Sequence, residues 1–174
     1  YGDNARNDNN HQVLLRYDIK KLNEYAGEVK FGDFYGEGPA KPESKYFAYT
    51  GNTTWGVQNL AYDAETGKMF MAVYKGRKGI FKNYDMFVFD VAVKPEKGKL
   101  AGVLYDRTKH DLIGSREKPV PGFFFKFGST GMCPVGGGQF YFAEPGKNPA
   151  NGRQYSRTRL YRWTGDFSRP FERL

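Results

Sequence analysis

The sequence predicts an all-β protein, and three observations support this prediction. Aromatic residues make up 17% of the 174 residues, including 13 Tyr and 15 Phe, and such side chains favour pleated, half-buried sheet surfaces. The 22 glycines suit a chain with many tight turns. Short apolar segments also recur in the same order along the chain. A long repeat made of short strands indicates a radial or stacked β array.

The repeat is seen in two matching stretches. The segment GNTTWGVQNLAYDAETGKMFMAVYKG at 51–76 is followed by the apolar run MFVFD at 86–90. It corresponds to GSTGMCPVGGGQFYFAEPG at 128–146, followed by RLYRW at 159–163. The N-terminal stretch YGDNARNDNNHQVLLRYD matches only the later part of this unit. We therefore expect one β-rich unit over residues 1–174, divided into a partial repeat with its connection at 1–44 and two repeats at 45–121 and 122–174.

Four strands are expected in each repeat. In the first repeat they span residues 46–50, 57–62, 68–74 and 86–91, and in the second 123–127, 132–135, 139–143 and 159–163. The segment DAETG at 63–67 places a turn-initiating Asp and a Gly able to take positive φ between two alternating runs, which predicts a tight hairpin. A helical turn is expected at 19–26 and an additional short strand at 101–106.

These residues resemble a β-propeller repeat. The stretch LAYDAETGKMFMAV at 60–73 is similar to blades that carry an apolar strand, a D-x-x-T-G hairpin and a second apolar strand. The resemblance implies four-stranded antiparallel blades. The chain would supply about two and a half of them, whereas a propeller closes with four to eight. The resemblance therefore implies further blades, from the same protein or from other copies. A β-sandwich is the alternative fold.

Strand direction then assigns the loops to two faces. Because successive antiparallel strands reverse direction, the loops within 51–56, 75–85, 128–131 and 145–157 should lie together with the N-terminal segment 1–11. The hairpin at 63–67 should point the other way. Binding residues concentrate in loops on a rigid scaffold, so we expect the ligand on the first of these faces.

The expected ligand is an anion, because the formal net charge is +8 and basic loops attract acidic partners. Arginine holds phosphate, sulfate or carboxylate through two parallel hydrogen bonds, and a Trp ring can stack on a sugar. The candidate ligand-binding residues are Asn52, Thr53, Thr54, Trp55, Gln58, Lys75, Arg77, Lys78, Arg153 and Arg157. The expected partner is an acidic glycan or a phosphorylated or sulfated small molecule. Turn chemistry selects the same Asn and Thr residues, and bases interleaved with aromatics also suit single-stranded nucleic acid, a less favoured partner.

Two further functions stay open at this point. The first is a hydrolase or lyase acting on an anionic sugar or phosphoester, in which Asp85 or Glu144 transfers a proton. The second is a structural or assembly module that pairs exposed strand edges with another chain. His11, His110 and the lone Cys133 form no diagnostic constellation, and the sequence shows no metal spacing and indicates no cofactor. No apolar run is long enough for a membrane span, and we expect an exported bacterial protein, extracellular or periplasmic.

Overall fold

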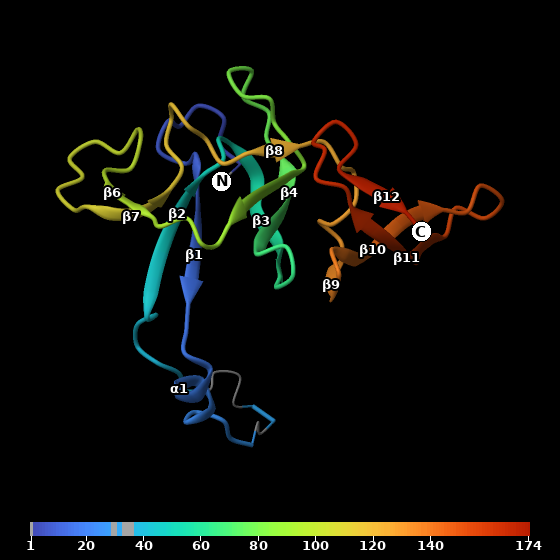
Figure 1. Cartoon of the computed structure of the whole chain (residues 1–174), viewed down its shortest axis with the longest axis horizontal. Helices are drawn as coiled ribbons and strands as arrows, with labels where there is room; N and C mark the ends of the chain where they lie inside the picture. The colour runs from blue at the N-terminus through green and yellow to red at the C-terminus, as the bar shows by residue number, and fades with distance from the viewer. Residues whose placement is uncertain (1, 29–30, 33–36) are drawn as a thin grey trace.

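The computed structural model describes residues 2–28, 31–32 and 37–174, and within them the chain is nearly all β, with three four-stranded sheets (Figure 1). Sheet A has the order β1 (His11–Arg16), β2 (Ser44–Tyr49), β7 (His110–Ile113), β6 (Glu96–Gly98). Sheet B has the order β3 (Thr53–Asp63), β4 (Lys68–Lys75), β5 (Met86–Asp90), β8 (Gly122–Phe123). Sheet C has the order β9 (Met132–Gly136), β10 (Gln139–Lys147), β11 (Gln154–Trp163), β12 (Phe171–Arg173). The predicted all-β class with antiparallel four-stranded sheets is confirmed, and the single parallel pairing among them joins β2 and β7.

Sheet B lies between the other two and is covered on both faces. Its strand β4 has a continuous apolar run because alternate side chains point to opposite faces. Phe70 and Ala72 belong to an aromatic-rich core shared with Phe140 and Phe142 of sheet C. Met71 and Val73 belong to a second core, shared with Leu14 and Ala48 of sheet A. A strand buried on both faces loses the polar alternation of a half-exposed one, which explains the run MFMAV at 69–73.

The hairpin predicted at 63–67 is confirmed. One carboxylate oxygen of Asp63 accepts hydrogen bonds from the backbone N–H of Thr66 at 3.0 Å and from its hydroxyl at 2.6 Å. Gly67 has φ +66°, a left-handed conformation that favours glycine. The hairpin joins β3 to β4 in antiparallel register, with Asp63 opposite Lys68. The predicted helical turn is also present as α1 (Ile19–Asn23), capped by the side chain of Asp18.

The expected assignment of strands to sheets is wrong by one strand. Residues 46–50 were expected to open the sheet that contains 57–62, but β2 pairs with β1 in sheet A. The backbone turns at Gly51, with φ +78°, and the chain then crosses into sheet B. In the same way, β8 is the last strand of sheet B, where Phe123 pairs with Met86, and it does not open sheet C. The expected strand at 123–127 is therefore limited to its first residue.

The additional strand expected at 101–106 is also wrong. Gly102 and Tyr105 both have positive φ, at +80° and +63°, and this left-handed backbone cannot continue an extended strand. The additional strands are instead β6 and β7, on either side of that segment. In the described ranges, no helix has the length and apolar character needed to cross a membrane.

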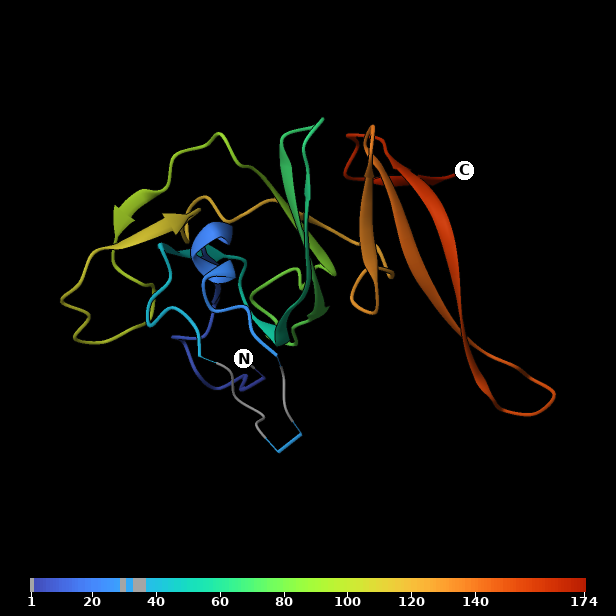
Figure 2. The same ribbon diagram turned by 90° about the horizontal axis from the view of Figure 1, so that it is seen from below.

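Sheets B and C meet along β3 and β9, which lie side by side. The side chain of Asn59 on β3 donates hydrogen bonds to the carbonyl oxygens of Gly128 at 2.7 Å and Ser129 at 2.9 Å. These bonds hold the segment that leads into β9. Figure 2 shows the β4–β5 loop and the β10–β11 loop at the opposite end of their sheets from the β3–β4 hairpin. The β10–β11 loop nevertheless lies well apart from the β4–β5 loop in both views, so the expectation that the two loops lie together is wrong.

Candidate functional site

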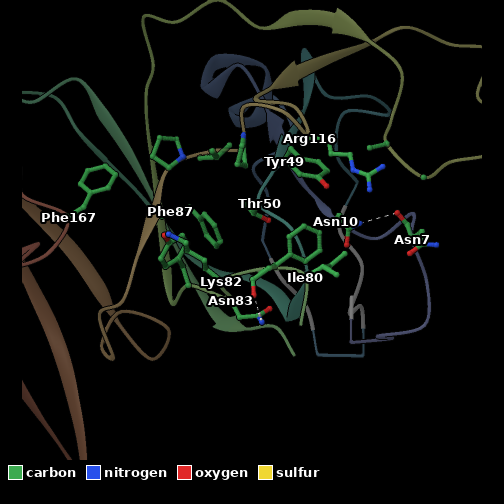
Figure 3. Close-up of a pocket in the computed structure, with 18 residues that line it drawn as sticks. Asn7, Asn10, Tyr49, Thr50, Ile80, Lys82, Asn83, Phe87, Arg116 and Phe167 are labelled. Atoms are coloured by element: carbon green, nitrogen blue, oxygen red, sulfur yellow. Dashed lines mark hydrogen bonds between the residues drawn. The ribbon is translucent and has the colours of Figure 1, made fainter. Parts of the chain in front are cut away.

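A pocket of about 870 Å³ opens between sheets A and B (Figure 3). Its walls come from the loop before β1, the end of β2, the β4–β5 loop with the start of β5, the β6–β7 loop and the β7–β8 loop, with Phe167 added from the β11–β12 loop of sheet C. Chain segments far apart in sequence therefore form it, at the junction where β2 ends and the chain crosses into sheet B. Its volume falls in the range of about 300–1,000 Å³ that is usual for small-molecule sites.

The β4–β5 loop has a defined shape at this pocket. Asn83 adopts φ +51°, and its side-chain amide donates to the carbonyl oxygens of Lys78 at 2.9 Å and Phe81 at 3.0 Å. The turn places the Phe81 ring against Tyr49, with ring centroids 6.3 Å apart. It also places that ring over Gly51, where a Cβ would lie 2.8 Å from ring atoms. Gly51 is thus required both by its φ and by this close approach.

Lys78 joins the β4–β5 loop to the loop before β1. Its side chain is only 7% exposed. The ammonium donates to the side-chain oxygens of Asn9 at 2.8 Å and Asn10 at 2.9 Å, and to the carbonyl oxygen of Arg6. Burial lowers the pKa of Lys78, and the nearby carboxylates of Asp3 and Asp8 oppose that shift. Since Asn10 lines the pocket, Lys78 holds one wall against another.

Replacing this lysine is expected to loosen the N-terminal loop. In Lys78→Met the three oxygen acceptors lose a charged donor, and hydrogen bonds to charged groups contribute about 1.5–3 kcal/mol. We expect the free energy of unfolding, measured in urea, to fall by about 2 kcal/mol. Lys82→Met in the same loop is the control, because Lys82 is exposed and surface changes stay within about 0.5 kcal/mol. Equal losses in both variants would contradict the anchoring role.

Two exposed cations stand at the pocket, Lys82 on the β4–β5 loop and Arg116 on the β7–β8 loop. Among the described residues, neither side chain forms a hydrogen bond or ion pair within the protein. The described lining contains no Asp or Glu, although Glu117 neighbours Arg116 and is bonded to the Ser115 hydroxyl at 2.9 Å. Arg116 is close enough to Glu117 to help lower the pKa of that carboxyl, but its N–H groups form no hydrogen bond among the described residues and are available for a ligand anion.

Tyr49 adds a polar group beside Arg116 (Figure 3). The residue is 3% exposed, and burial raises the pKa of its phenol above the usual range. The phenol therefore stays protonated at neutral pH, so it can donate a hydrogen bond. Thr50 and Asn10 lie on the same side of the pocket in Figure 3. The Thr50 hydroxyl already donates to the Gly51 carbonyl oxygen at 3.0 Å and the Asn10 amide to the Asn7 carbonyl oxygen at 3.1 Å, so the Arg116 guanidinium and the Tyr49 phenol are the donors that this end offers to an acidic group.

The polar residues predicted around Asn52 lie at the start of β3, outside the pocket lining. Asn52 and Thr53 are buried. The side-chain oxygen Oδ1 of Asn52 accepts a hydrogen bond from the Arg77 backbone N–H at 3.1 Å, and the Thr54 hydroxyl donates to the backbone carbonyl oxygen of Lys75 at 2.7 Å. These bonds connect the start of β3 to the end of β4, which is a structural use of the Asn and Thr side chains.

Two members of that set are exposed. Trp55 keeps 69% of its surface accessible, and the Gln58 side chain donates to the Trp55 carbonyl oxygen at 3.1 Å. The structure thus divides the predicted polar set into groups bonded within the protein and an exposed indole. It does not gather them into one cavity.

The structure places the predicted basic residues in different parts of the molecule. Lys75 and Arg77 are exposed beside the pocket loop, whereas Lys78 is buried. Arg153 and Arg157 belong to the β10–β11 arm of sheet C, which projects away from the rest of the molecule in Figure 2. The Arg157 guanidinium lies over the Tyr155 ring, 4.8 Å from its centroid.

The two catalytic candidates have different partners. Burial raises the pKa of Asp85, and Lys75 and a hydrogen bond from the Phe125 backbone partly offset that shift. Glu144 lies on β10, accepts a hydrogen bond from the Tyr161 hydroxyl at 2.6 Å and has the Arg173 guanidinium at 3.9 Å. Burial, together with Glu144, raises the pKa of Tyr161 to about 12. Tyr161 is thus a stable donor to Glu144 and not an activated nucleophile.

Sequence reasoning missed the residues that line the pocket. Lys82 lies in the loop 75–85 but is not among the candidate binding residues, and Arg116 lies in a Pro- and Lys-rich connection between the repeats. Tyr49 and Phe81 looked like ordinary strand and loop aromatics. No spacing relates these positions, because the pocket forms where the connection after β7 returns to sheet B. The nearest signal is the basic, Pro-flanked SREKPVPG at 115–122.

Across the described part of the chain, no three His, Cys, Asp or Glu side chains come together in the way a metal site requires. Comparison with family models, with curated proteins and with solved structures finds no match to this chain.

Proposed function

We propose that this protein binds an anionic ligand, an acidic glycan or a phosphorylated or sulfated compound, in the pocket between sheets A and B. The observation that supports this most is the pair of cations at the pocket. Lys82 and Arg116 have no bonded partner among the described residues, and the described lining holds no carboxylate. Two cations whose N–H groups form no hydrogen bond among the described residues, beside a recess of ligand size, favour an acidic guest.

A binding measurement tests this directly. Isothermal titration with a trisulfated heparin disaccharide is expected to show one site. Arg116→Gln and Lys82→Gln should each weaken the affinity about tenfold, because a charge-assisted hydrogen bond contributes about 1.5–3 kcal/mol.

Arg153→Gln is the matched control, since it removes the same charge from the exposed β10–β11 loop. It should change the affinity less than about twofold. Equal loss in all three variants would indicate unspecific attraction to net charge, and no loss in the two pocket variants would contradict the proposed site.

The architecture that carries the site is proposed to be part of a β-propeller. Sheet B is covered by sheet A on one face and by sheet C on the other, as in a row of neighbouring blades. The outer faces of the two flanking sheets expose apolar side chains: Val13 and Leu15 on sheet A, and Val135 and Tyr141 on sheet C. Further sheets, from the same protein or from other copies, would cover these faces as they cover sheet B.

Sedimentation of the 174-residue chain tests this arrangement. We expect a mass above that of one chain, because exposed apolar sheet faces associate. Tyr141→Asp should shift the distribution toward the monomer, while Tyr62→Asp, on sheet B and similarly exposed, should not. A concentration-independent monomer would contradict completion by copies and would favour the β-sandwich alternative.

A further inference from the structure

The two ends of the pocket differ in chemistry. In Figure 3, Arg116, Tyr49, Asn10 and Thr50 lie toward one side, and Phe87 and Phe167 lie toward the other. The first side offers the guanidinium of Arg116 and the phenol of Tyr49, while the Asn10 amide and the Thr50 hydroxyl donate to backbone carbonyl oxygens of the protein. The second offers aromatic rings, and Lys82 lies near Phe87 in the same view. The pocket is therefore divided into a donor-rich end and an aromatic end.

The aromatic end is built from rings that contact one another. The Tyr84 ring meets Phe87 edge-on with centroids 6.0 Å apart, and it meets Phe124 at 5.0 Å. The main chain from Pro119 to Gly122 completes this wall. Phe87 itself is only 2% exposed, so Tyr84 and the more exposed Phe167 are the rings that a guest ring can contact, in offset or edge-to-face geometry.

Apolar surface stays exposed beside this end. Phe167 is 43% exposed and Ile80 is 75% exposed, and both line the pocket. Phe124, beside Tyr84, is 58% exposed. A local concentration of exposed apolar groups at a concave site marks a surface that a ligand covers. The donor-rich end alone would bind any small anion, but the aromatic end favours a ligand that also carries a ring.

We propose that the ligand class is an aromatic compound bearing one acidic group, such as an aryl sulfate, aryl phosphate or aryl carboxylate. This inference rests on the proposed anion-binding function and narrows it. The acidic group is held by Arg116 with the Tyr49 hydroxyl beside it, and the ring lies against Tyr84 and Phe167. A compact, fully polar anion leaves the aromatic end exposed to water, so it binds more weakly.

The test uses 8-anilinonaphthalene-1-sulfonate, a fluorescent aromatic sulfonate that brightens in apolar surroundings. We expect saturable binding with one molecule per chain. Arg116→Gln should weaken it about tenfold through loss of the charged donor, and Phe167→Ala about threefold through loss of ring contact. The uncharged analogue N-phenyl-1-naphthylamine should bind less tightly and should respond to Phe167→Ala but not to Arg116→Gln.

Matched controls separate the pocket from other exposed surface. Tyr141→Ala removes a ring that is 44% exposed on the outer face of sheet C, close to the exposure of Phe167, and should leave the affinity unchanged. Arg153→Gln is the control for the charge. Circular dichroism of each variant establishes that the sheets are intact before its affinity is compared.

The outcomes for this inference and for the proposed function are distinguishable. If Phe167→Ala and Tyr141→Ala weaken binding of the fluorophore equally, or if neither weakens it, the proposal that the ligand carries an aromatic ring is overturned. If Arg116→Gln still weakens binding of the heparin disaccharide in that case, the proposed anion site stands without the aromatic-ring proposal. If Arg116→Gln and Phe167→Ala both weaken binding of the fluorophore while Arg153→Gln and Tyr141→Ala leave it unchanged, an aromatic compound with an acidic group is supported as the ligand class.

Discussion

Replacing Phe70 with alanine is expected to destabilise the protein more than any other single change proposed for it. The Phe70 side chain is fully buried in the centre of the core between sheets B and C. Its ring meets Phe140 at 4.9 Å, Trp163 at 5.2 Å and Phe171 at 6.0 Å between centroids. Truncating a buried Phe to Ala costs about 3–5 kcal/mol, since it leaves a cavity that the neighbouring rings only partly fill.

The effect is measured as the free energy of unfolding in urea, with near-ultraviolet circular dichroism to report the packing of the aromatic core. Tyr62→Ala is the control, because Tyr62 lies on the neighbouring strand β3 with 47% of its surface exposed. It should cost less than about 1 kcal/mol. A loss at Phe70 no larger than the loss at Tyr62 would show that sheets B and C do not pack through this core.

The second large effect is a loss of stability in mild acid, caused by His11. The residue is 6% exposed and packs edge-on against Tyr49 with ring centroids 5.0 Å apart. Burial, with a smaller contribution from His110, lowers the pKa of His11 from 6.5 to about 4. Its Nδ1 atom has no hydrogen-bond partner among the described residues. The folded protein therefore keeps this imidazole neutral at pH values where the unfolded chain would protonate it.

The direction of the pH effect follows from proton uptake. Between pH 6.5 and about 4 the unfolded state binds the proton and the folded state does not, so stability decreases as the pH falls through this window. Above pH 6.5 the imidazole is neutral in both the folded and the unfolded state, so His11 causes no loss of stability there. Below about pH 4 both states bind the proton, so the loss of stability does not grow further. A shift of this size corresponds to about 3 kcal/mol.

The comparison is between the wild type and His11→Phe, which keeps a ring against Tyr49 but cannot titrate. Urea unfolding at pH 7 and pH 4 should show a fall in the wild type that is about 3 kcal/mol larger than in the variant. The difference removes the contribution of the carboxylates, which titrate in both proteins. His110→Gln should retain most of the fall because it keeps His11. Identical falls in the wild type and His11→Phe would contradict the buried neutral histidine.

The local elements of the fold were predictable because their signals are local. The hairpin at 63–67 depends on one Asp that bonds to Thr66 and on one Gly with positive φ. Both residue types are selected by the turn itself. The strand at 68–74 depends on an apolar run that is long enough to be buried on both faces. Each of these signals is complete within about a dozen residues, so no tertiary information is needed.

The grouping of strands into sheets depends on long-range pairing, which leaves no such signal. Residues 46–50 and 123–127 are apolar runs that suit either neighbouring sheet equally well. Whether they pair backward or forward is decided by the turn at Gly51 and by pairing of Phe123 with Met86. The parallel pairing of β2 with β7 joins positions more than 60 residues apart. Sequence periodicity carries no information on that choice.

The candidate site shows the same limit. Asn52, Thr53 and Thr54 were singled out because hydroxyl and amide groups make good ligands, but in the structure they bond to neighbouring backbone and side-chain groups. No sequence signal marks Arg116, because it lies in a connection between the repeats. Its importance comes from the segments that the fold brings beside it, namely the end of β2 and the β4–β5 loop.

The central claim is that an anion binds between sheets A and B, and the most direct test maps the binding surface residue by residue. The measurement is a titration of ¹⁵N-labelled protein with the trisulfated heparin disaccharide, followed by amide chemical shifts. The account predicts shifts concentrated at Thr50, Asn83 and Arg116. Shifts concentrated instead at Trp55, Gln58 and the β10–β11 loop would contradict it, because they would place the ligand on the residues that the sequence alone had indicated.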